Sequence, residues 1–413
     1  MSRPAAGGGS GGLFPARAVV IGTGLIGTSV ALALRRAGVA VWLADTDPAA
    51  AQLAADIGAG TVLASTVLPS GDPAGLDLPL GVPPGGPADV ALLAVPPGSV
   101  AAALARAQGP GIARWYTDVA SVKSLPLAQA QAMGCDLASF VPGHPLSGRE
   151  RSGPAAARAD LFLGRPWVIC PGPGTPPDGV AAIEALARTC GAEPVLASAA
   201  DHDRWVALVS HAPHIVSAAM AARLAGAADG ALALAGQGLR DVTRIAAGDS
   251  GLWTQILAAN AGPVSQVLAA VAGDLAAVAE ALADTARPGG LPGSGPSGAG
   301  PGGAPLTGAG AGGPELKALM ALLDQGSAGV ARIPGKRGAP ARAESIVQVV
   351  IPDRPGELAR LFQAAGEAGI NIEDIGIEHS PGMPVGVAEL TVRPEAAAAL
   401  TEALAANGWP VRR

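Results

Sequence analysis

The sequence has little charge and no basic excess, and both shortages narrow what the protein can be. Charged residues make up only 15% of the 413 residues against 49% apolar ones, a globular composition that excludes a disordered chain. Lysine and arginine total 27 against 33 acidic residues. The resulting net charge of −6 argues against a partner such as nucleic acid, whose binders are normally basic. A small anionic substrate is still compatible with this negative net charge if several arginines lie in one cleft.

The sequence also shows no pattern of cysteine pairs, a leader or a membrane segment. Cys135, Cys170 and Cys190 show no CxxC spacing, which predicts reduced packing residues in a cytoplasmic protein. Residues 1–12 have no apolar core, so no signal peptide is expected. The apolar helical stretch after Trp205 is interrupted by histidine, proline and arginine, so we expect no membrane span.

Alternating strand and helix patterns run through residues 15–198 and predict a Rossmann-type α/β domain with a parallel, doubly wound sheet. The stretch 68–87 is rich in glycine and proline and is interpreted as a surface insertion. The two last strand-like runs are expected to close the domain. The runs that carry this prediction are 17–21, 39–45, 88–96, 114–120, 165–171 and 193–198.

Strand patterns stop at residue 198, and helical patterns predict an all-helical domain over 199–285 that supplies a substrate wall and a dimer interface. Residues 286–313 are almost wholly Gly, Pro, Ala and Ser, which predicts a flexible linker. A short helix over 314–323 is expected next. The last unit, 344–413, follows the order βαββα with a final short strand, which is the ferredoxin-like βαββαβ arrangement.

The segment GTGLIG predicts a dinucleotide site because it follows a strand, opens a helix and has an acidic residue at the end of the next strand. Gly22 permits the tight turn, Gly24 lets the backbone approach a pyrophosphate, and Gly27 allows close packing of helix on strand. The helix N-terminus offers unpaired N–H groups to the phosphates. Asp45 would accept hydrogen bonds from the ribose hydroxyls and repel a 2′-phosphate, which favours NAD over NADP.

Four of the five histidines fall between residues 144 and 214, and this clustering indicates a site. His144 is expected on a loop beyond the sheet, where a doubly wound fold binds its ligands. His211 and His214 are three residues apart and share a helix face. A zinc site would need a third ligand and usually an HExxH-type carboxylate, which the sequence lacks, so we predict no metal.

Six separated motifs resemble those of TyrA-family prephenate dehydrogenases in their order and spacing, over residues 15–285. Two further segments, PDRPGELARLF (352–362) and AGINIEDI (368–375), resemble an ACT domain, the amino-acid-sensing unit that some TyrA enzymes carry. The six motifs are GTGLIGTS (22–29), AVPP (94–97), TDVASVKS (117–124), GHPLSGRERSG (143–153), DHDRWVALVSHAPH (201–214) and LRDVTRIAAGDSGLW (239–253).

The resemblance implies a homodimer that uses NAD to convert prephenate to 4-hydroxyphenylpyruvate with loss of CO2, in tyrosine biosynthesis. His144 would be the base at the substrate hydroxyl, Ser121 would orient that hydroxyl, and Arg244 would clamp a carboxylate. Further implied substrate contacts are Ser210 and His211, with Glu150 as a gate over the cleft. Further implied cofactor contacts are Leu25, Ile26, Val95 and Pro96.

The ACT-like end implies allosteric control by an aromatic amino acid, with tyrosine the expected effector. A plainer interpretation is a β-to-α turn with Pro355 at the first helical position and Asp353 near the cap. Such a helix N-terminus also suits the carboxylate of an amino acid. The expected effector contacts are Asp353, Pro355, Gly356 and Asn371.

Three other functions stay open. Arogenate dehydrogenase acts on a substrate with an amino group in place of the keto group. A β-hydroxyacid dehydrogenase would show a lysine in the helical domain, whereas 199–285 contains none. A non-enzymatic amino-acid sensor with bound NAD is the third. Lys123 and Arg149 have no assigned role, and Asp203 and Asp241 are interpreted as structural partners of nearby arginines.

Overall fold

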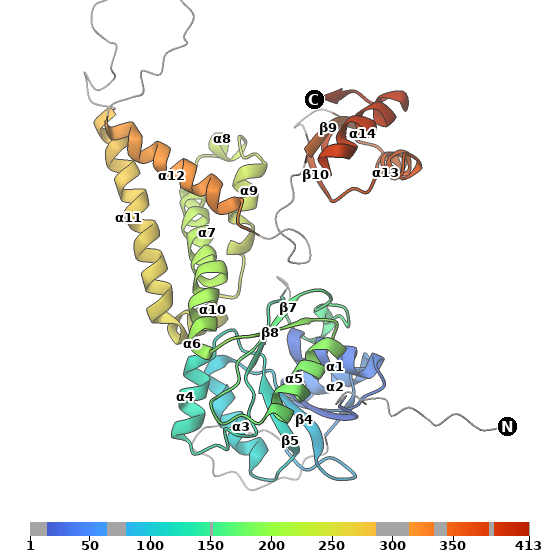
Figure 1. Cartoon of the computed structure of the whole chain (residues 1–413), viewed down its shortest axis with the longest axis vertical. Helices are drawn as coiled ribbons and strands as arrows, with labels where there is room; N and C mark the ends of the chain where they lie inside the picture. Colours follow the sequence, from blue (N-terminus) through green and yellow to red (C-terminus); the bar gives the residue numbers. More distant parts are fainter. Residues whose placement is uncertain are drawn as a thin grey trace, which may run out of the picture. The chain divides into compact units, whose positions relative to one another are not determined.

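A computed structural model describes residues 15–63, 80–148, 152–285, 314–333, 345–379 and 384–412 (Figure 1). The chain divides into two compact units, Met1–Leu275 and Ala276–Arg413. The predicted linker, most of the predicted insertion, Arg149 and Glu150 lie outside the described residues.

The first unit contains a five-stranded parallel sheet in the order β3-β2-β1-β4-β5. The central strand β1 pairs with β2 on one side and with β4 on the other, so the carboxyl ends of these three strands meet at one edge. β3 is a two-residue strand that the sequence did not predict. The strands are β1 (Arg17–Ile21), β2 (Ala40–Ala44), β3 (Thr61–Val62), β4 (Ala88–Leu93) and β5 (Ala113–Asp118).

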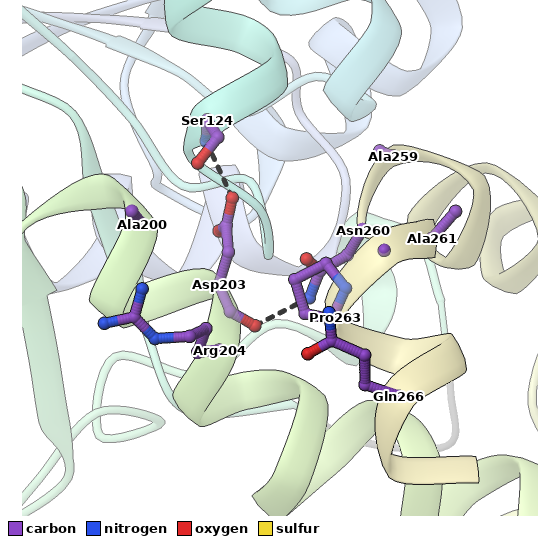
Figure 2. A pocket seen from close by; sticks show the side chains of 10 residues that line it. Ser124, Ala200, Asp203, Arg204, Ala259, Asn260, Ala261, Pro263 and Gln266 are labelled. Carbon is purple, nitrogen blue, oxygen red and sulfur yellow. Dashed lines mark hydrogen bonds between the residues drawn. The ribbon is translucent and has the colours of Figure 1, made fainter. Parts of the chain in front are cut away.

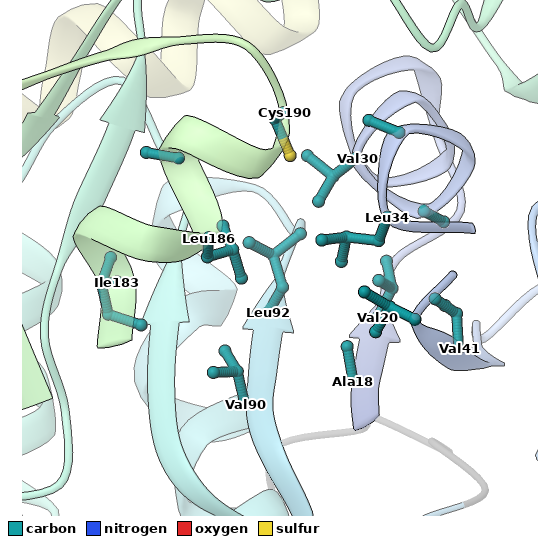
Figure 3. Packing of buried hydrophobic residues seen from close by; sticks show 14 of the residues in the cluster. Ala18, Val20, Val30, Leu34, Val41, Val90, Leu92, Ile183, Leu186 and Cys190 are labelled. Atoms are coloured by element: carbon teal, nitrogen blue, oxygen red, sulfur yellow. The ribbon is translucent and has the colours of Figure 1, made fainter. Parts of the chain in front are cut away.

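Both faces of this sheet are buried, which explains why its strands are apolar without alternation. Ala18 and Val20 of β1 face one core, and their neighbours Val19 and Ile21 face the other. Figure 3 shows the first core, where residues of β1, β2 and β4 meet side chains of α1 and α5. The helices of this domain are α1 (Leu25–Arg36), α2 (Pro48–Asp56), α3 (Val100–Gln108), α4 (Ser124–Ala132) and α5 (Pro177–Thr189).

The two late strands do not extend the parallel sheet. β7 (Pro166–Ile169) and β8 (Glu193–Leu196) form a separate three-stranded sheet with β6 (Gly143–Pro145), which pairs antiparallel to β7. The expectation that His144 lies on a loop is therefore wrong, since it lies on β6. The chain reaches this sheet by a bridge between Tyr116 of β5 and Phe140, which places β6 beside the end of β5.

Residues 199–285 contain only helices and turns, and all of them are described. Ser198 begins the region because its hydroxyl accepts a bond from the backbone N–H of Asp201. The stretch Ala207–His211 (η3) is a π-helix, a departure that Pro213 favours because it has no N–H for the carbonyl of Val209. The main helices are α6 (Ala199–Val206), α7 (Ala212–Ala222), α9 (Gln237–Thr243), α10 (Ser250–Ala259) and α11 (Ala261–Thr285).

The described part of the second unit ends in a four-stranded antiparallel sheet in the order β10-β11-β9-β12. With its two helices it has the predicted βαββαβ order and a core of its own, which includes Val349, Leu390 and Trp409. The preceding helix α12 (Pro314–Val330) runs beyond the predicted Leu323. The elements are β9 (Ser345–Pro352), α13 (Glu357–Glu367), β10 (Asp374–His379), β11 (Val385–Val392), α14 (Pro394–Ala406) and β12 (Val411–Arg412).

One expected helix start in this unit is wrong. Pro355 does not occupy the first helical position, because α13 begins at Glu357 and Gly356 precedes it in the left-handed region at φ 88°. Asp353, Pro355 and Gly356 are exposed in the turn between β9 and α13. Asn371 is exposed after α13, and its side-chain amide bonds to Glu373.

Candidate active site

The glycine-rich turn has the close contacts and the open space that a dinucleotide needs. A Cβ on Gly22, which has φ 95°, would lie 2.2 Å from the carbonyl oxygen of Ala94, and one on Gly27 would lie 1.9 Å from the carbonyl oxygen of Gly22. Gly24 has no atom within 4 Å of its Cβ position. It is the N-cap of α1 and leaves the first N–H groups of that helix without a side-chain cap, so a pyrophosphate fits there.

Asp45 follows β2 at the sheet edge where the glycine-rich turn also lies. Thr23 of that turn holds the Asp45 carboxylate in place. Oδ2 accepts bonds from the backbone N–H of Thr23 at 2.5 Å and from the Thr23 hydroxyl at 2.7 Å. Oδ1 accepts the backbone N–H of Asp47 at 2.9 Å. A fixed carboxylate with lone pairs to spare suits the hydroxyls of an adenosine ribose. Of the other expected cofactor contacts, Leu25, Ile26 and Val95 are half-buried and Pro96 is exposed, all following β1 or β4.

His144 is held in a neutral state by its surroundings. Burial lowers its pKa well below the ordinary 6.5, and the neighbouring His202, Lys123 and His211 lower it further. Its Nδ1 lies 2.8 Å from Nε2 of His202, whose Nδ1 lies 2.8 Å from Oδ1 of Asp203. A neutral imidazole at pH 7 can accept a proton, which is what a general base requires.

A buried ion pair fixes the strand that carries His144. The side chains of Lys123 and Asp118 are both fully buried and bonded to each other. The Lys123 ammonium also donates to the carbonyl of Gly143 at 2.6 Å, and Asp118 accepts the N–H of Gly143 at 3.2 Å. Lys123, which had no role from the sequence, therefore holds the backbone beside His144 within the protein interior.

Ser121 lies in the loop between β5 and the ion-pair lysine. Its hydroxyl oxygen is shielded from solvent and has no hydrogen-bond partner among the described residues. A buried hydroxyl without a partner costs free energy, and a ligand that bonds to it removes that cost. Ser121 therefore has the properties expected of a group that orients a substrate hydroxyl.

His211 ends the π-helix and is buried, while its neighbour Ser210 is half-buried. Burial lowers the pKa of His211 to about 4. Its Nδ1 lies 3.1 Å from the side-chain nitrogen of Asn260. Next to it, His214 stacks on Trp253 with ring centres 3.6 Å apart.

Arg244 differs from these histidines in its exposure to solvent. It begins a short 3-10 turn, Arg244–Ala246 (η5), that contacts α7, and its side chain is exposed. Glu150 lies outside the described residues. Of the residues expected at the substrate, the structure thus brings the half-buried His144 and the buried His211 into one cluster, and it places Ser121 on the loop beside the strand of His144.

Three residues of this cluster were missed. His202 received no role, and Asp203 was interpreted as a partner of arginines, which is wrong because its carboxylate accepts bonds from His202 and from the backbone of Lys123 and Ser124. The nearby arginine, Arg204, pairs instead with Asp201. Asn260 gave no signal, since its partner His211 is 49 residues away in the sequence.

Comparisons with known proteins show the family of this chain. Residues 86–196 match the family described as prephenate dehydrogenase, nucleotide-binding domain, and residues 198–290 match prephenate dehydrogenase, dimerization domain. A Streptomyces niveus protein named probable prephenate dehydrogenase NovF is 40% identical over 395 residues, covering 95% of this chain and 98% of that protein.

Two crystal structures share the fold. Arogenate dehydrogenase from Synechocystis is 26% identical with a TM-score of 0.52, and the match covers 66% of this chain and 94% of that one. Prephenate dehydrogenase from A. aeolicus, in complex with hydroxyphenyl propionate and NAD+, is 24% identical with a TM-score of 0.55, covering 66% and 92%. Because the Streptomyces relative matches across nearly all of both proteins, this chain belongs to the prephenate dehydrogenase family of NAD-dependent dehydrogenases.

Proposed function

We propose that this protein converts prephenate to 4-hydroxyphenylpyruvate and CO2 with NAD as oxidant, as a step of tyrosine biosynthesis. The observation that carries the proposal is His144, a half-buried and neutral histidine whose Nδ1 is already bonded to His202. Its other ring nitrogen, Nε2, can serve as a base. The unpartnered hydroxyl of Ser121 supports the proposal, because it can bond to the hydroxyl that reacts.

The proton balance of the reaction fits a base of this kind. Prephenate has a hydroxyl on C4 of a cyclohexadiene ring and two carboxylates. The hydroxyl proton moves to His144 as NAD, when bound, accepts the hydride from C4. Loss of CO2 then sends an electron pair through the ring to the C4 oxygen, which takes the proton back from His144. The base needs only to hold the proton for a time, so a transient, well-positioned imidazolium is enough.

The remaining roles extend the same proposal. His211 belongs to the cluster, Ser210 precedes it on the π-helix, and both would bond to polar groups of the substrate. Arg244 would clamp a substrate carboxylate, since guanidinium and carboxylate pair bidentately. Glu150 keeps its proposed role as a gate.

Asp45 leads to a prediction about the cofactor. We expect kcat/KM with NAD to exceed that with NADP by at least about tenfold, equivalent to about 1.4 kcal/mol of transition-state discrimination. The physical reason is that the fixed Asp45 carboxylate accepts bonds from ribose hydroxyls but repels a 2′-phosphate. Initial rates with each cofactor at saturating prephenate measure this ratio. Equal values of kcat/KM would contradict the proposed contact.

Turnover itself tests the proposed function. The absorbance of NADH at 340 nm is followed with prephenate and, separately, with arogenate. Faster turnover of prephenate supports the proposal. Faster turnover of arogenate supports the second candidate, which the match to the Synechocystis arogenate dehydrogenase favours. Bound NAD without turnover of either substrate would indicate an amino-acid sensor.

We also propose a homodimer formed through residues 199–285. Two stretches, Ala199–Gly226 and Ala261–Thr285, are long and apolar enough to cross a membrane by length and composition. Leu208 and Val209 are among their exposed apolar side chains. A partner subunit that covers these faces explains them, and the match of 198–290 to a dimerization domain supports this explanation.

The βαββαβ unit is proposed to be an ACT domain that binds an aromatic amino acid, with tyrosine the expected effector. Its own buried core supports independent folding. The proposed contacts are Asp353, Pro355, Gly356 and Asn371, of which the first three lie in the turn before α13. An amino-acid carboxylate would bind at this helix N-terminus.

Truncation after Thr285 separates regulation from catalysis. We expect the truncated enzyme to turn over prephenate but to lose its response to tyrosine, because the proposed substrate and cofactor residues all precede that point. Tyrosine is titrated against both forms at fixed prephenate and NAD. Equal responses would mean that tyrosine competes at the active site. No response in either form would mean that the unit has another ligand or a structural role.

A further inference from the structure

Asp203 lies where two hydrogen-bond chains begin, one ending on His144 and the other on His211. Its carboxylate accepts the backbone N–H groups of Lys123 and Ser124, both at 2.8 Å, and a bond from Nδ1 of His202. Its backbone carbonyl accepts from the side-chain nitrogen of Asn260 at 2.8 Å. Figure 2 shows Asp203 between Ser124 and Asn260, beside an open pocket of about 290 Å³ that all three help to line.

The first chain determines which nitrogen of His144 carries hydrogen. The ionised carboxylate of Asp203 can only accept, so Nδ1 of His202 must donate, and a neutral His202 ring then has a bare Nε2. That bare nitrogen accepts from Nδ1 of His144 at 2.8 Å. The neutral His144 ring therefore has its hydrogen on Nδ1 and a lone pair on Nε2.

The carboxylate in this chain is ionised at neutral pH. Burial opposes ionisation of Asp203, but hydrogen bonds from His202, Ser124 and Lys123 outweigh it and lower the pKa. A proton taken up by Nε2 of His144 would make an imidazolium whose charge faces His202 and, through it, this carboxylate. The same chain therefore stabilises the charged form that the base passes through.

The second chain gives His211 the opposite tautomer. The Asn260 atom that faces the carbonyl of Asp203 must be its NH2 group, because a carbonyl only accepts. The same nitrogen lies 3.1 Å from Nδ1 of His211, so Nδ1 accepts its second hydrogen. The neutral His211 ring then carries its hydrogen on Nε2 and can donate a bond with it.

We infer that Asp203 is a positioning residue that sets opposite tautomers in two histidines, a bare Nε2 on His144 and an Nε2–H on His211. Resting on the proposed function, this assigns His144 as the base and His211 as a hydrogen-bond donor to the substrate. It also removes His211 as an alternative base, since Nε2 carries the hydrogen and the lone pair of Nδ1 is bonded to Asn260.

Nitrogen-15 NMR of the histidine rings tests the inference on the full chain without substrate. Only five histidines are present, so the ring signals can be assigned by single His→Asn variants. We expect an Nδ1–H form for His144 and an Nε2–H form for His211. The same tautomer in both rings, or the reverse pair, would overturn the inference. Because this readout needs no turnover, a wild-type enzyme inactive on prephenate would sink the proposed function and leave the tautomer result standing.

Asp203→Ala, with Asp201→Ala as the matched control, links the tautomers to activity. Asp201 is two residues earlier and pairs at the surface with Arg204. We expect Asp203→Ala to lower kcat by roughly 10²–10⁴, as losing the carboxylate of a histidine pair does, with a small change in KM. The His144 signal should lose its pure Nδ1–H form, whereas His211 should keep its tautomer because the backbone carbonyl remains. An unchanged kcat, or a loss of both tautomers alike, would contradict the assignment.

The middle of the chain gives an independent variant pair if the Asp203 variant does not fold. In His202→Gln the amide oxygen can still accept from Nδ1 of His144, whereas His202→Leu offers no acceptor. We expect the glutamine variant to retain activity within about tenfold and the leucine variant to lose about 10²-fold or more. Equal losses in both would mean that His202 only fills space.

Discussion

Replacing His144 with asparagine is expected to lower kcat by roughly 10²–10⁴, the contribution typical of a general base, with little change in the KM for prephenate. Asparagine can keep a hydrogen bond with His202 but has no nitrogen that accepts a proton. Steady-state rates of NADH formation measure both constants. The KM for prephenate should stay nearly unchanged because His144 removes a proton and is not proposed to bind either substrate carboxylate.

The control is the same substitution at His379, which lies on β10 in the second unit. His379→Asn should leave turnover at the wild-type level. Near-wild-type turnover of His144→Asn would mean that the base is elsewhere. Such a result would also conflict with the tautomers, which leave His211 without a lone pair on its free nitrogen.

The pKa of His144 also determines the pH below which the enzyme is expected to lose activity. Burial holds the pKa of His144 well below 6.5, so the neutral base persists as the pH falls through 6.5. We therefore expect kcat/KM to stay level from neutral pH to below 6.5 and to fall only as the pH passes through the lowered value. The free energy of unfolding should change in the same direction as the pH falls. His144 in the unfolded chain takes up a proton near pH 6.5 but the folded protein does not, so the stability that His144 contributes above that pH is lost as the pH falls below it.

Much of the nucleotide-binding half could be predicted from sequence because its signals are local. A strand, a glycine-rich turn, a helix and an acidic strand end lie within 29 consecutive residues, from Arg17 to Asp45, and each glycine has a steric reason that the structure bears out at Gly22 and Gly27. The βαββαβ order was predictable for the same reason, since each run has its own period and turn.

The histidine cluster was predictable only in part because long-range packing assembles it. His144 and His202 are 58 residues apart, and no local sequence pattern predicts that their rings are in contact. The interpretation of Asp203 failed because the adjacent Arg204 suggested an ion pair, whereas the carboxylate bonds to His202 and to the backbone of Lys123 and Ser124. The three-residue strand β6 was missed because it contains Pro145 and directly follows Pro142, and proline is rare within strands.

The buried Lys123–Asp118 pair leads to the largest expected effect on stability. Lys123→Met should lower the free energy of unfolding by about 3–5 kcal/mol, because it leaves a buried carboxylate without its cation. Both side chains are fully shielded from solvent, so water cannot screen the loss. Urea unfolding followed by tryptophan fluorescence measures it. Activity should fall as well, since the ammonium no longer holds the carbonyl of Gly143 next to His144.

Two further variants distinguish the effect of breaking the ion pair from the effect of losing any lysine. Lys317→Met changes an exposed lysine on α12 and should alter stability by no more than about 0.5 kcal/mol. The double variant Asp118→Asn/Lys123→Met removes both charges and should recover a large part of the stability lost in the single variant, because no uncompensated charge stays buried. Its turnover should stay low, since the neutral pair still lacks the donor to Gly143. A Lys123→Met protein as stable as Lys317→Met would mean that the carboxylate finds another partner or takes up a proton.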